Sequence, residues 1–254
     1  MQMLLISKLA GLGILFVLGY IFGRRNLIGD QGVETIAWIV IDVTMPALFF
    51  TGVLESGFII GNKGLILAML AGILLPCLGL LLSLPLFKIL SFKNKEKGAI
   101  AFSCCVGNSS FIPLPLCSAP GTLACLAYIL GNNIFLFSLG IGLLSGQKVN
   151  EKYNIIRIFT HPQALAFALG LALFSLNLEP PEWIMEPLDG LAKATLPLAM
   201  LLTGAILARE RLQLKGKMGH IASVSLIKLL LLPLCALLIL KPFNLALLEG
   251  LPHR

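Results

Sequence analysis

Charged side chains are scarce in this sequence. Asp, Glu, Lys and Arg make up 12% of the 254 residues, against about 25% in a typical soluble domain. Hydrophobic residues make up 57%, and the mean hydropathy is +0.95. This composition excludes an ordinary soluble domain and predicts an all-α, polytopic protein of the lipid bilayer. The sequence pI of about 9.2 does not indicate a nucleic-acid partner, because the basic residues lie in short loops between apolar runs.

Motifs of catalysis and cofactor binding are also missing. The sequence contains no His-Glu-x-x-His, Gly-x-Ser-x-Gly or Gly-x-x-x-x-Gly-Lys-Ser/Thr motif. Its three histidines lie at the ends of apolar runs or in the tail, and its six cysteines lie in apolar segments without a Cys-x-x-Cys pair. We therefore expect no enzyme activity, no cofactor and no metal. An intramembrane enzyme is the disfavoured alternative.

The apolar residues form eight runs that can cross a bilayer, although the sixth is short. They cover residues 3–22, 33–54, 64–87, 98–117, 122–144, 162–178, 187–207 and 219–240. The loops after the odd-numbered runs carry thirteen basic residues, whereas the loops after the even-numbered runs carry only Lys63. The positive-inside rule then predicts a multi-pass protein of the cell inner membrane with its N-terminus outside.

The fourth run, 98–117, contains residues that a helix does not tolerate. They are Gly107, Asn108, Ser109 and Ser110, followed by Pro113 and Pro115. Glycine and small polar residues weaken a helix, and each proline removes a backbone donor and clashes with the preceding turn. Broken backbone at membrane depth is tolerated where it is buried in protein or lines a cavity, and transporters use it to hold substrates. A substrate site is the interpretation we favour, and a proline-kinked structural helix is the alternative.

Four polar side chains, Asn108 at the break and three elsewhere, are candidates for the same chemistry. Asn108 would donate its amide to a substrate carboxylate or cap the broken helix, and Asn132 would line the site or bond to another helix. Asp42 and Lys228 lie at similar depth in the second and eighth runs, where ionisable groups are costly and usually functional or paired. Asp42 would couple transport to protons and Lys228 would attract an anion. Alternatively, the two form a structural ion pair, or Lys228 extends toward the interface. Asp189 and Lys193, four residues apart, are expected to form a local helix pair.

A weak internal repeat relates the two halves of the chain. A Thr-x-Pro motif occurs at Pro46 and again at Pro197, and a Leu-Leu-Pro motif occurs at Pro76 and again at Pro233. The separations are 151 residues (197 − 46) and 157 residues (233 − 76). Five spans separate the members of each pair, so the second copy is inverted in the membrane.

The repeat predicts how the chain is divided. Residues 1–144 form a first repeat of five spans with a broken fourth span, and residues 145–161 form a cytoplasmic loop. Residues 162–240 form an incomplete second repeat of three spans, and residues 241–254 form a C-terminal tail. The partner of the broken span is expected near residue 272 (115 + 157), beyond Arg254.

Four stretches resemble the auxin efflux carrier family, in its bacterial branch. They match, in order, the end of its first helix, the proline motif of its second, the crossover motif of its fourth, and its seventh helix. The stretches are Gly19-Tyr20-Ile21-Phe22-Gly23-Arg24-Arg25, Asp42 to Phe50, Gly107 to Pro115, and Thr195 to Ala205. The family's crossover Asn and Pro correspond to Asn108 and Pro115, whereas Pro113 stands where the family usually has glycine.

The resemblance implies a ten-helix inverted-repeat fold of five plus five helices, like that of the sodium/bile-acid symporters. In that fold a core domain, whose fourth and ninth helices break and cross, moves against a scaffold domain. The resemblance also implies a secondary transporter, or permease, for a small organic anion such as a dicarboxylate, and a homodimer. The eight spans found here leave an alternative: a truncated, inactive family member, or one that needs a partner chain to supply two helices.

Overall fold

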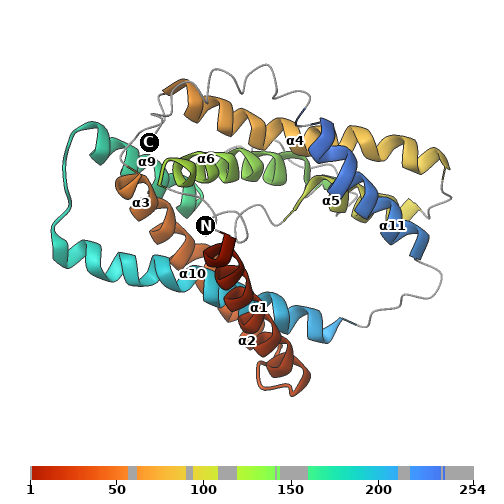
Figure 1. Cartoon of the computed structure of the whole chain (residues 1–254), viewed down its shortest axis with the longest axis horizontal. Helices are drawn as coiled ribbons and strands as arrows, with labels where there is room; N and C mark the ends of the chain where they lie inside the picture. The colour runs from red at the N-terminus through yellow and green to blue at the C-terminus, as the bar shows by residue number, and fades with distance from the viewer. Residues whose placement is uncertain are drawn as a thin grey trace. The chain divides into compact units, whose positions relative to one another are not determined.

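The computed structural model describes residues 2–56, 62–89, 94–107, 119–140, 142–143, 160–210, 218–235 and 237. Every regular element within these ranges is a helix, which confirms the all-α class (Figure 1). Four helical segments are long and apolar enough to cross a membrane: 30–55, 63–85, 121–140 and 182–209. Shorter apolar helices cover 10–24, 162–175 and 221–235. Seven predicted spans thus coincide with apolar helices, which is the pattern of a polytopic membrane protein.

The helices fall into two compact units. The first unit holds α1 (Gln2–Arg24), α2 (Asp30–Trp38), η1 (Ile39–Thr44), α3 (Met45–Glu55), α9 (Pro162–Ser175), α10 (Glu182–Arg209) and the beginning of α6 (Ala119–Phe135). The second holds α4 (Asn62–Ile89), α5 (Asn94–Cys105), the rest of α6, η3 (Leu136–Gly140), α11 (Met218–Leu226) and η4 (Ile227–Leu231). Both units draw on both predicted repeats, and the boundaries of those repeats stay a prediction.

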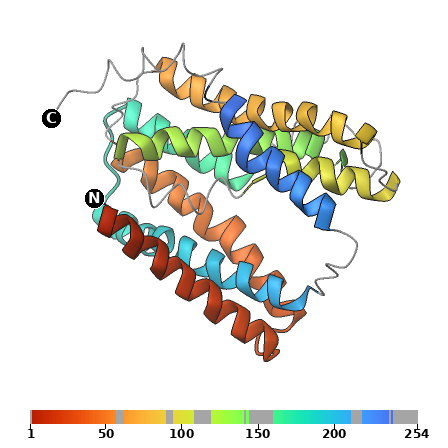
Figure 2. The same ribbon diagram turned by 45° about the vertical axis from the view of Figure 1, so that its right-hand side comes forward.

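In the first unit, α1 packs along α10 through small residues (Figure 2). A Cβ on Gly19 would collide with the backbone carbonyl of Leu201, and one on Gly204 would collide with the carbonyl of Phe16. Gly23 meets the backbone of Ala205 in the same way. Small residues let the two backbones approach closely, which is how membrane helices associate when lipid is as apolar as their side chains.

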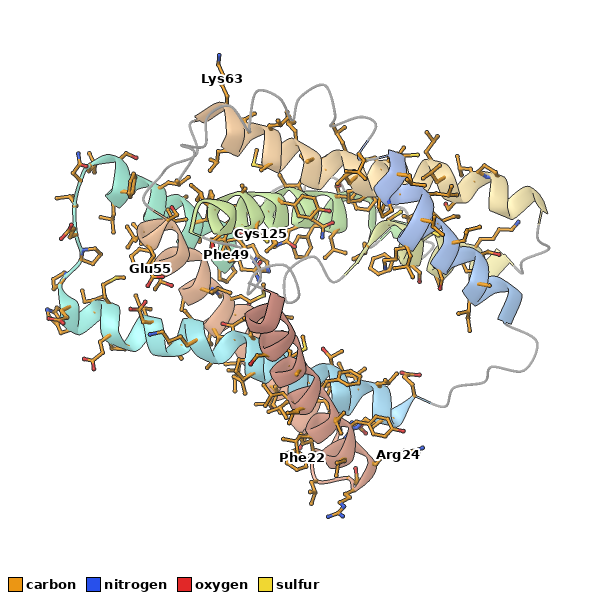
Figure 3. The ribbon with its side chains drawn as sticks, in the orientation of Figure 1. Phe22, Arg24, Phe49, Glu55, Lys63 and Cys125 are labelled. Carbon is orange, nitrogen blue, oxygen red and sulfur yellow. The ribbon has the colours of Figure 1, made fainter. Side chains whose placement is uncertain are left out.

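A second contact in this unit joins α3 to α9. The rings of Phe49 and Phe167 meet edge to face, with their centroids 6.2 Å apart, and Phe49 is fully buried. Phe49 lies midway along α3 and Glu55 lies at its end (Figure 3). One turn away, Gly170 lets α9 approach the backbone of Phe50. This packing fixes the second predicted span against the sixth.

Helices α1 and α9 end in the same way. Asn26 and Asn177 adopt left-handed backbone conformations, with φ of 54° and 52°. In each case the asparagine N–H and the next N–H bond back to carbonyls three and five residues earlier, which is a Schellman cap. The two caps lie 151 residues apart (177 − 26), the same separation as Pro46 and Pro197. The internal repeat itself stays a prediction.

Two short π-helical segments precede prolines. Segment η1 ends one residue before Met45-Pro46, and η4 ends one residue before Leu232-Pro233. Proline lacks the N–H that would continue the α-helical ladder, so the preceding turn widens. Asp42 lies inside η1 and Lys228 lies inside η4. Both ionisable residues singled out in the sequence therefore lie on widened turns, a type of segment often found at functional sites.

Candidate functional site

The fourth predicted span breaks where its sequence indicates. Helix α5 ends at Cys105, and Val106 and Gly107 are no longer helical, although the apolar run continues to residue 117. The last helical bond is from the Val106 N–H to the Phe102 carbonyl, at 2.8 Å. The predicted site residues that follow lie outside the described residues: Asn108, Ser109, Ser110, Pro113 and Pro115. Their role stays a prediction, but the helix stops before the first of them.

Lys228 lies at this break. Its ammonium donates hydrogen bonds to the carbonyl oxygens of Val106, at 2.6 Å, and Ser103, at 3.1 Å. The last carbonyls of a helix have no donor within the helix and carry a partial negative charge, so they are natural partners for a cation. The side chain thus reaches the carboxyl end of another helix, α5. This contact is not an ion pair with a carboxylate, and the position of Lys228 relative to the membrane interface stays a prediction.

The break leaves room for the lysine because Gly107, its second non-helical residue, has no side chain. A Cβ built on Gly107 would lie 3.3 Å from Cε of Lys228 and 3.8 Å from Nζ. Around the contact, Cys104, Cys105 and Ile227 are buried. The described cysteines are free thiols. Lys228 therefore places a positive charge in partly dry surroundings, next to the residue that precedes Asn108.

Asn132 belongs to the same unit as Lys228. It lies on α6, is 7% exposed, and follows Gly131, whose Cα faces α4 so closely that a Cβ would collide with the Met69 carbonyl. On the opposite helix, Gly72 meets the backbone of Tyr128 in the same way. Within the described residues no hydrogen bond joins Asn132 to Lys228. The structure thus places Asn132 in a close α4–α6 contact, and its role in binding stays a prediction.

Asp42 lies in the first unit, half-buried on η1. Among the residues that the structure describes, none forms an ion pair with it; the ion pair found there joins Arg209 to Asp30. The carbonyl of the preceding residue, Ile41, accepts a hydrogen bond of 3.3 Å from the side-chain amide of Gln163. This contact ties the widened turn to α9 and leaves the Asp42 carboxylate free of partners within the described part of the chain.

Two cavities in the first unit were not predicted from the sequence. The larger, about 370 Å³, is lined by residues from the ends of α3 and α9 and the start of α10. The smaller, about 230 Å³, is lined by Thr51, Thr122, Asp189 and Lys193, among others, and Glu55 lines both. Asp189 and Lys193 do not form the expected close pair, since no ion pair joins them within 4.0 Å in the described structure. No sequence motif marks these cavities, because they arise between helices distant in the chain.

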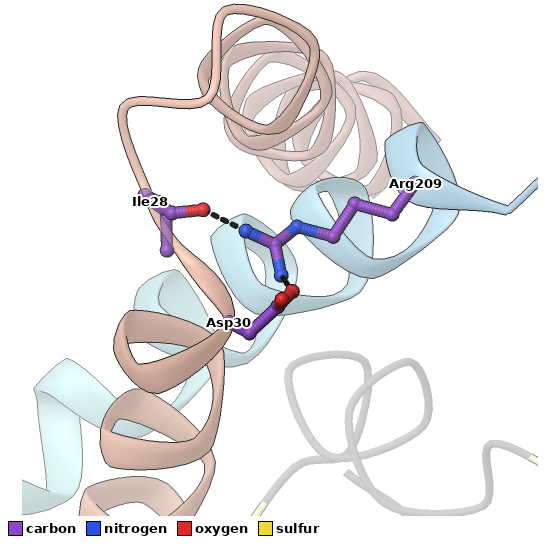
Figure 4. Close-up of polar contacts among 3 residues, drawn as sticks. All are labelled: Ile28, Asp30 and Arg209. Carbon is purple, nitrogen blue, oxygen red and sulfur yellow. Dashed lines mark hydrogen bonds and ion pairs between the residues drawn. The ribbon is translucent and has the colours of Figure 1, made fainter.

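Arg209 fixes one end of the first unit. From the end of α10 its guanidinium donates to the carboxylate of Asp30 and to the carbonyl of Ile28 (Figure 4). The Asp30 side chain is 96% exposed. Arg209 thus holds the turn between α1 and α2, whereas Lys228 bonds only to backbone carbonyls among the residues that the structure describes.

Comparisons with known proteins agree on one class. Residues 4–153 and 145–249 match the family Mem_trans, described as "Membrane transport protein". A protein of Methanothermobacter thermautotrophicus named "Uncharacterized transporter" is 26% identical over 232 residues, which cover 88% of this chain and 74% of that protein. Together the two matches extend over nearly all of the described helices, including the break and Lys228.

Proposed function

Since the chain belongs to the Mem_trans family of membrane transport proteins, the auxin efflux carrier family, we propose that it is a secondary transporter for a small organic anion such as a dicarboxylate. That it is a multi-pass membrane transporter follows from the family and the apolar helices. The anionic substrate is our proposal. The observation that carries it is the Lys228 ammonium bound at the end of α5.

Charge balance at the break supports an anion. The carboxyl end of a helix is equivalent to roughly half a negative charge, and the ammonium adds a full positive charge. The sum is positive, in a region where α5 alone would repel a carboxylate. Asn108 follows Gly107 directly, so its amide is close in sequence to this charge. A carboxylate at this break would therefore meet the positive charge of Lys228 and, in the adjacent residue, a neutral amide donor.

Transport would proceed by alternating access, with the unit that carries the break moving against the other unit. Asp42 lies in the other unit and would take up and release the coupled proton. Asn132 would support the break from α6. We further propose an inner-membrane location with the N-terminus outside, from the distribution of basic loops, and a homodimer.

Uptake of labelled malonate and malate into proteoliposomes tests the proposal. The full chain would be reconstituted alone, with and without a proton gradient, beside Asn108→Ala. We expect uptake by the wild type and little by Asn108→Ala. Asn26→Gly is the matched control, because glycine adopts the left-handed conformation of this cap, and it should keep wild-type uptake.

The outcomes separate the alternatives. Uptake that persists in Asn108→Ala would contradict a site at the break. No uptake of either acid by a folded wild type would contradict a dicarboxylate carrier acting alone. Uptake restored by co-reconstitution with a chain supplying two further helices would support the partner-dependent alternative.

A further inference from the structure

The Lys228 ammonium occupies a position that an inorganic cation would otherwise suit. Two carbonyl oxygens, those of Ser103 and Val106, converge on Nζ from the end of α5. In the broken helices of transporters, unwound carbonyls and half-helix carboxyl ends are the groups that coordinate Na⁺. Here a side chain from η4 satisfies them instead.

The lysine is held at this position by its own helix. It lies inside η4, where the Leu232 N–H bonds to the Ile227 carbonyl five residues back and Pro233 has no N–H to give. Ile227 is buried, and this anchors the turn while the neighbouring Lys228 side chain extends to α5. A cation carried by a widened turn is always present, unlike an ion drawn from solution.

We propose that the Lys228 ammonium is a tethered substitute for an alkali cation at the carboxyl end of α5. The wild-type protein therefore does not bind Na⁺ or K⁺ at the Ser103 and Val106 carbonyls. Removing the side chain leaves the Ser103 and Val106 carbonyls without their donor, next to the buried Cys104 and Cys105, and makes a site for Na⁺ or K⁺. This inference does not depend on which anion the protein carries.

Binding of radioactive sodium to the purified full chain tests this directly. We expect Lys228→Ala to bind about one Na⁺ per chain and the wild type to bind none above background. Lys228→Arg, which keeps a permanent cation at the position, should also bind none. Lys193→Ala is the matched control: it removes another in-span lysine, one with no hydrogen bond or ion pair in the described structure, and should behave as the wild type.

Thermal unfolding gives a second readout that needs no transport. In sodium chloride, compared with choline chloride at equal concentration, the Tm of Lys228→Ala should rise by about 2–4 °C, the shift for about 1 kcal/mol in a chain of this size. The wild type should show no such difference. Lys228→Gln, which keeps one donor without the charge, provides the same test if Lys228→Ala does not fold.

Two results would overturn the proposal. One is a folded Lys228→Ala or Lys228→Gln that neither binds sodium nor gains stability from it. The other is equal sodium binding by the wild type and Lys228→Ala. Neither depends on uptake, so a failure of the proposed anion transport leaves this test intact.

Discussion

Two widened turns that precede prolines, η1 in the first unit and η4 in the second, share this position and differ in their contacts. Both η1 and η4 end one residue before an X-Pro pair. In η1 the Met45 N–H bonds to the Val40 carbonyl, and Pro46 has no N–H, so the Ile41 carbonyl loses both backbone donors it could have had. The Gln163 amide of α9 replaces them. In η1, therefore, a side chain of the neighbouring helix donates the hydrogen bond that a backbone carbonyl of the turn lacks.

In η4 the relation is reversed, because a side chain of the turn donates hydrogen bonds to the carbonyls of the neighbouring helix. Lys228 leaves its own helix to supply the orphan carbonyls at the end of α5. Asp42, the ionisable residue of η1, has no ion-pair partner in the described part of the chain. Both turns precede a proline, whereas the charge on each turn and the helix that faces it decide what the turn does.

The largest effect is expected at η4. Lys228→Met keeps the length of the side chain and removes the charge, so both hydrogen bonds to α5 are lost. Hydrogen bonds to charged groups are worth about 1.5–3 kcal/mol each, and we expect the free energy of unfolding to fall by about 3 kcal/mol and uptake by at least about tenfold. Chemical unfolding and proteoliposome uptake measure both. A fully stable Lys228→Met would show that the contact is incidental.

The second effect is expected at η1. Gln163→Leu leaves the part-buried Ile41 carbonyl without its donor, and we expect a loss of about 1 kcal/mol in unfolding free energy. Pro46→Ala restores a backbone N–H within reach of this carbonyl, so the cost of Gln163→Leu should shrink in that background. A double-mutant cycle measures the difference. Equal costs in the two backgrounds would contradict the account of the widened turn.

A smaller effect is expected where a cation meets a carboxylate in solvent. Asp30→Asn removes the charge partner of Arg209 but leaves the Ile28 carbonyl in place. Because the Asp30 side chain is 96% exposed, we expect a loss below about 1 kcal/mol that vanishes in high salt. Unfolding at two salt concentrations checks this. A larger loss of unfolding free energy that does not depend on salt would contradict this and show that the Arg209 contact stabilises the protein as much as the Lys228 contact does.

The smallest effect on stability is expected at Asp42. Asp42→Asn removes a charge with no ion-pair partner in the described residues, so the unfolding free energy should change by less than about 0.5 kcal/mol. Uptake should, however, lose its dependence on the proton gradient. Uptake measured with and without the gradient decides this. A mutant that remains gradient-dependent would remove Asp42 from the coupling mechanism.

The sequence was enough to predict the features that lipid imposes. Apolar runs must become helices because backbone groups cannot stay unpaired in a bilayer, so all eight runs coincide with helices, at least in part. The end of α5 before Asn108 also followed from residue chemistry, since Gly107 and the polar triplet weaken any helix. Lys228 was a candidate for a different reason, namely that an ionisable side chain at membrane depth is costly and usually functional or paired.

What the sequence could not predict are contacts between distant segments. No local pattern joins Lys228 to Val106, which lies 122 residues earlier, or Gln163 to Ile41. The expected Asp189–Lys193 pair failed for the same reason, because helix spacing permits such a pair while the surroundings decide whether it forms. The widened turns had a visible signal in their prolines, yet Pro76 and Pro197 lie inside unbroken α-helices, so proline alone does not predict a π segment.

The close packing of α1 against α10 has a consequence for the order of events during synthesis. Gly23 and Gly204, on its two sides, are 181 residues apart (204 − 23). At roughly 5–20 residues per second, α1 waits in the membrane for about 9–36 s before its partner exists. During that time its glycine face lacks the α10 backbone that it contacts in the folded protein. The contact between α1 and α10 therefore forms late in synthesis. We expect a bulky residue at Gly19 or Gly204 to cause, first of all, faster degradation of newly made protein.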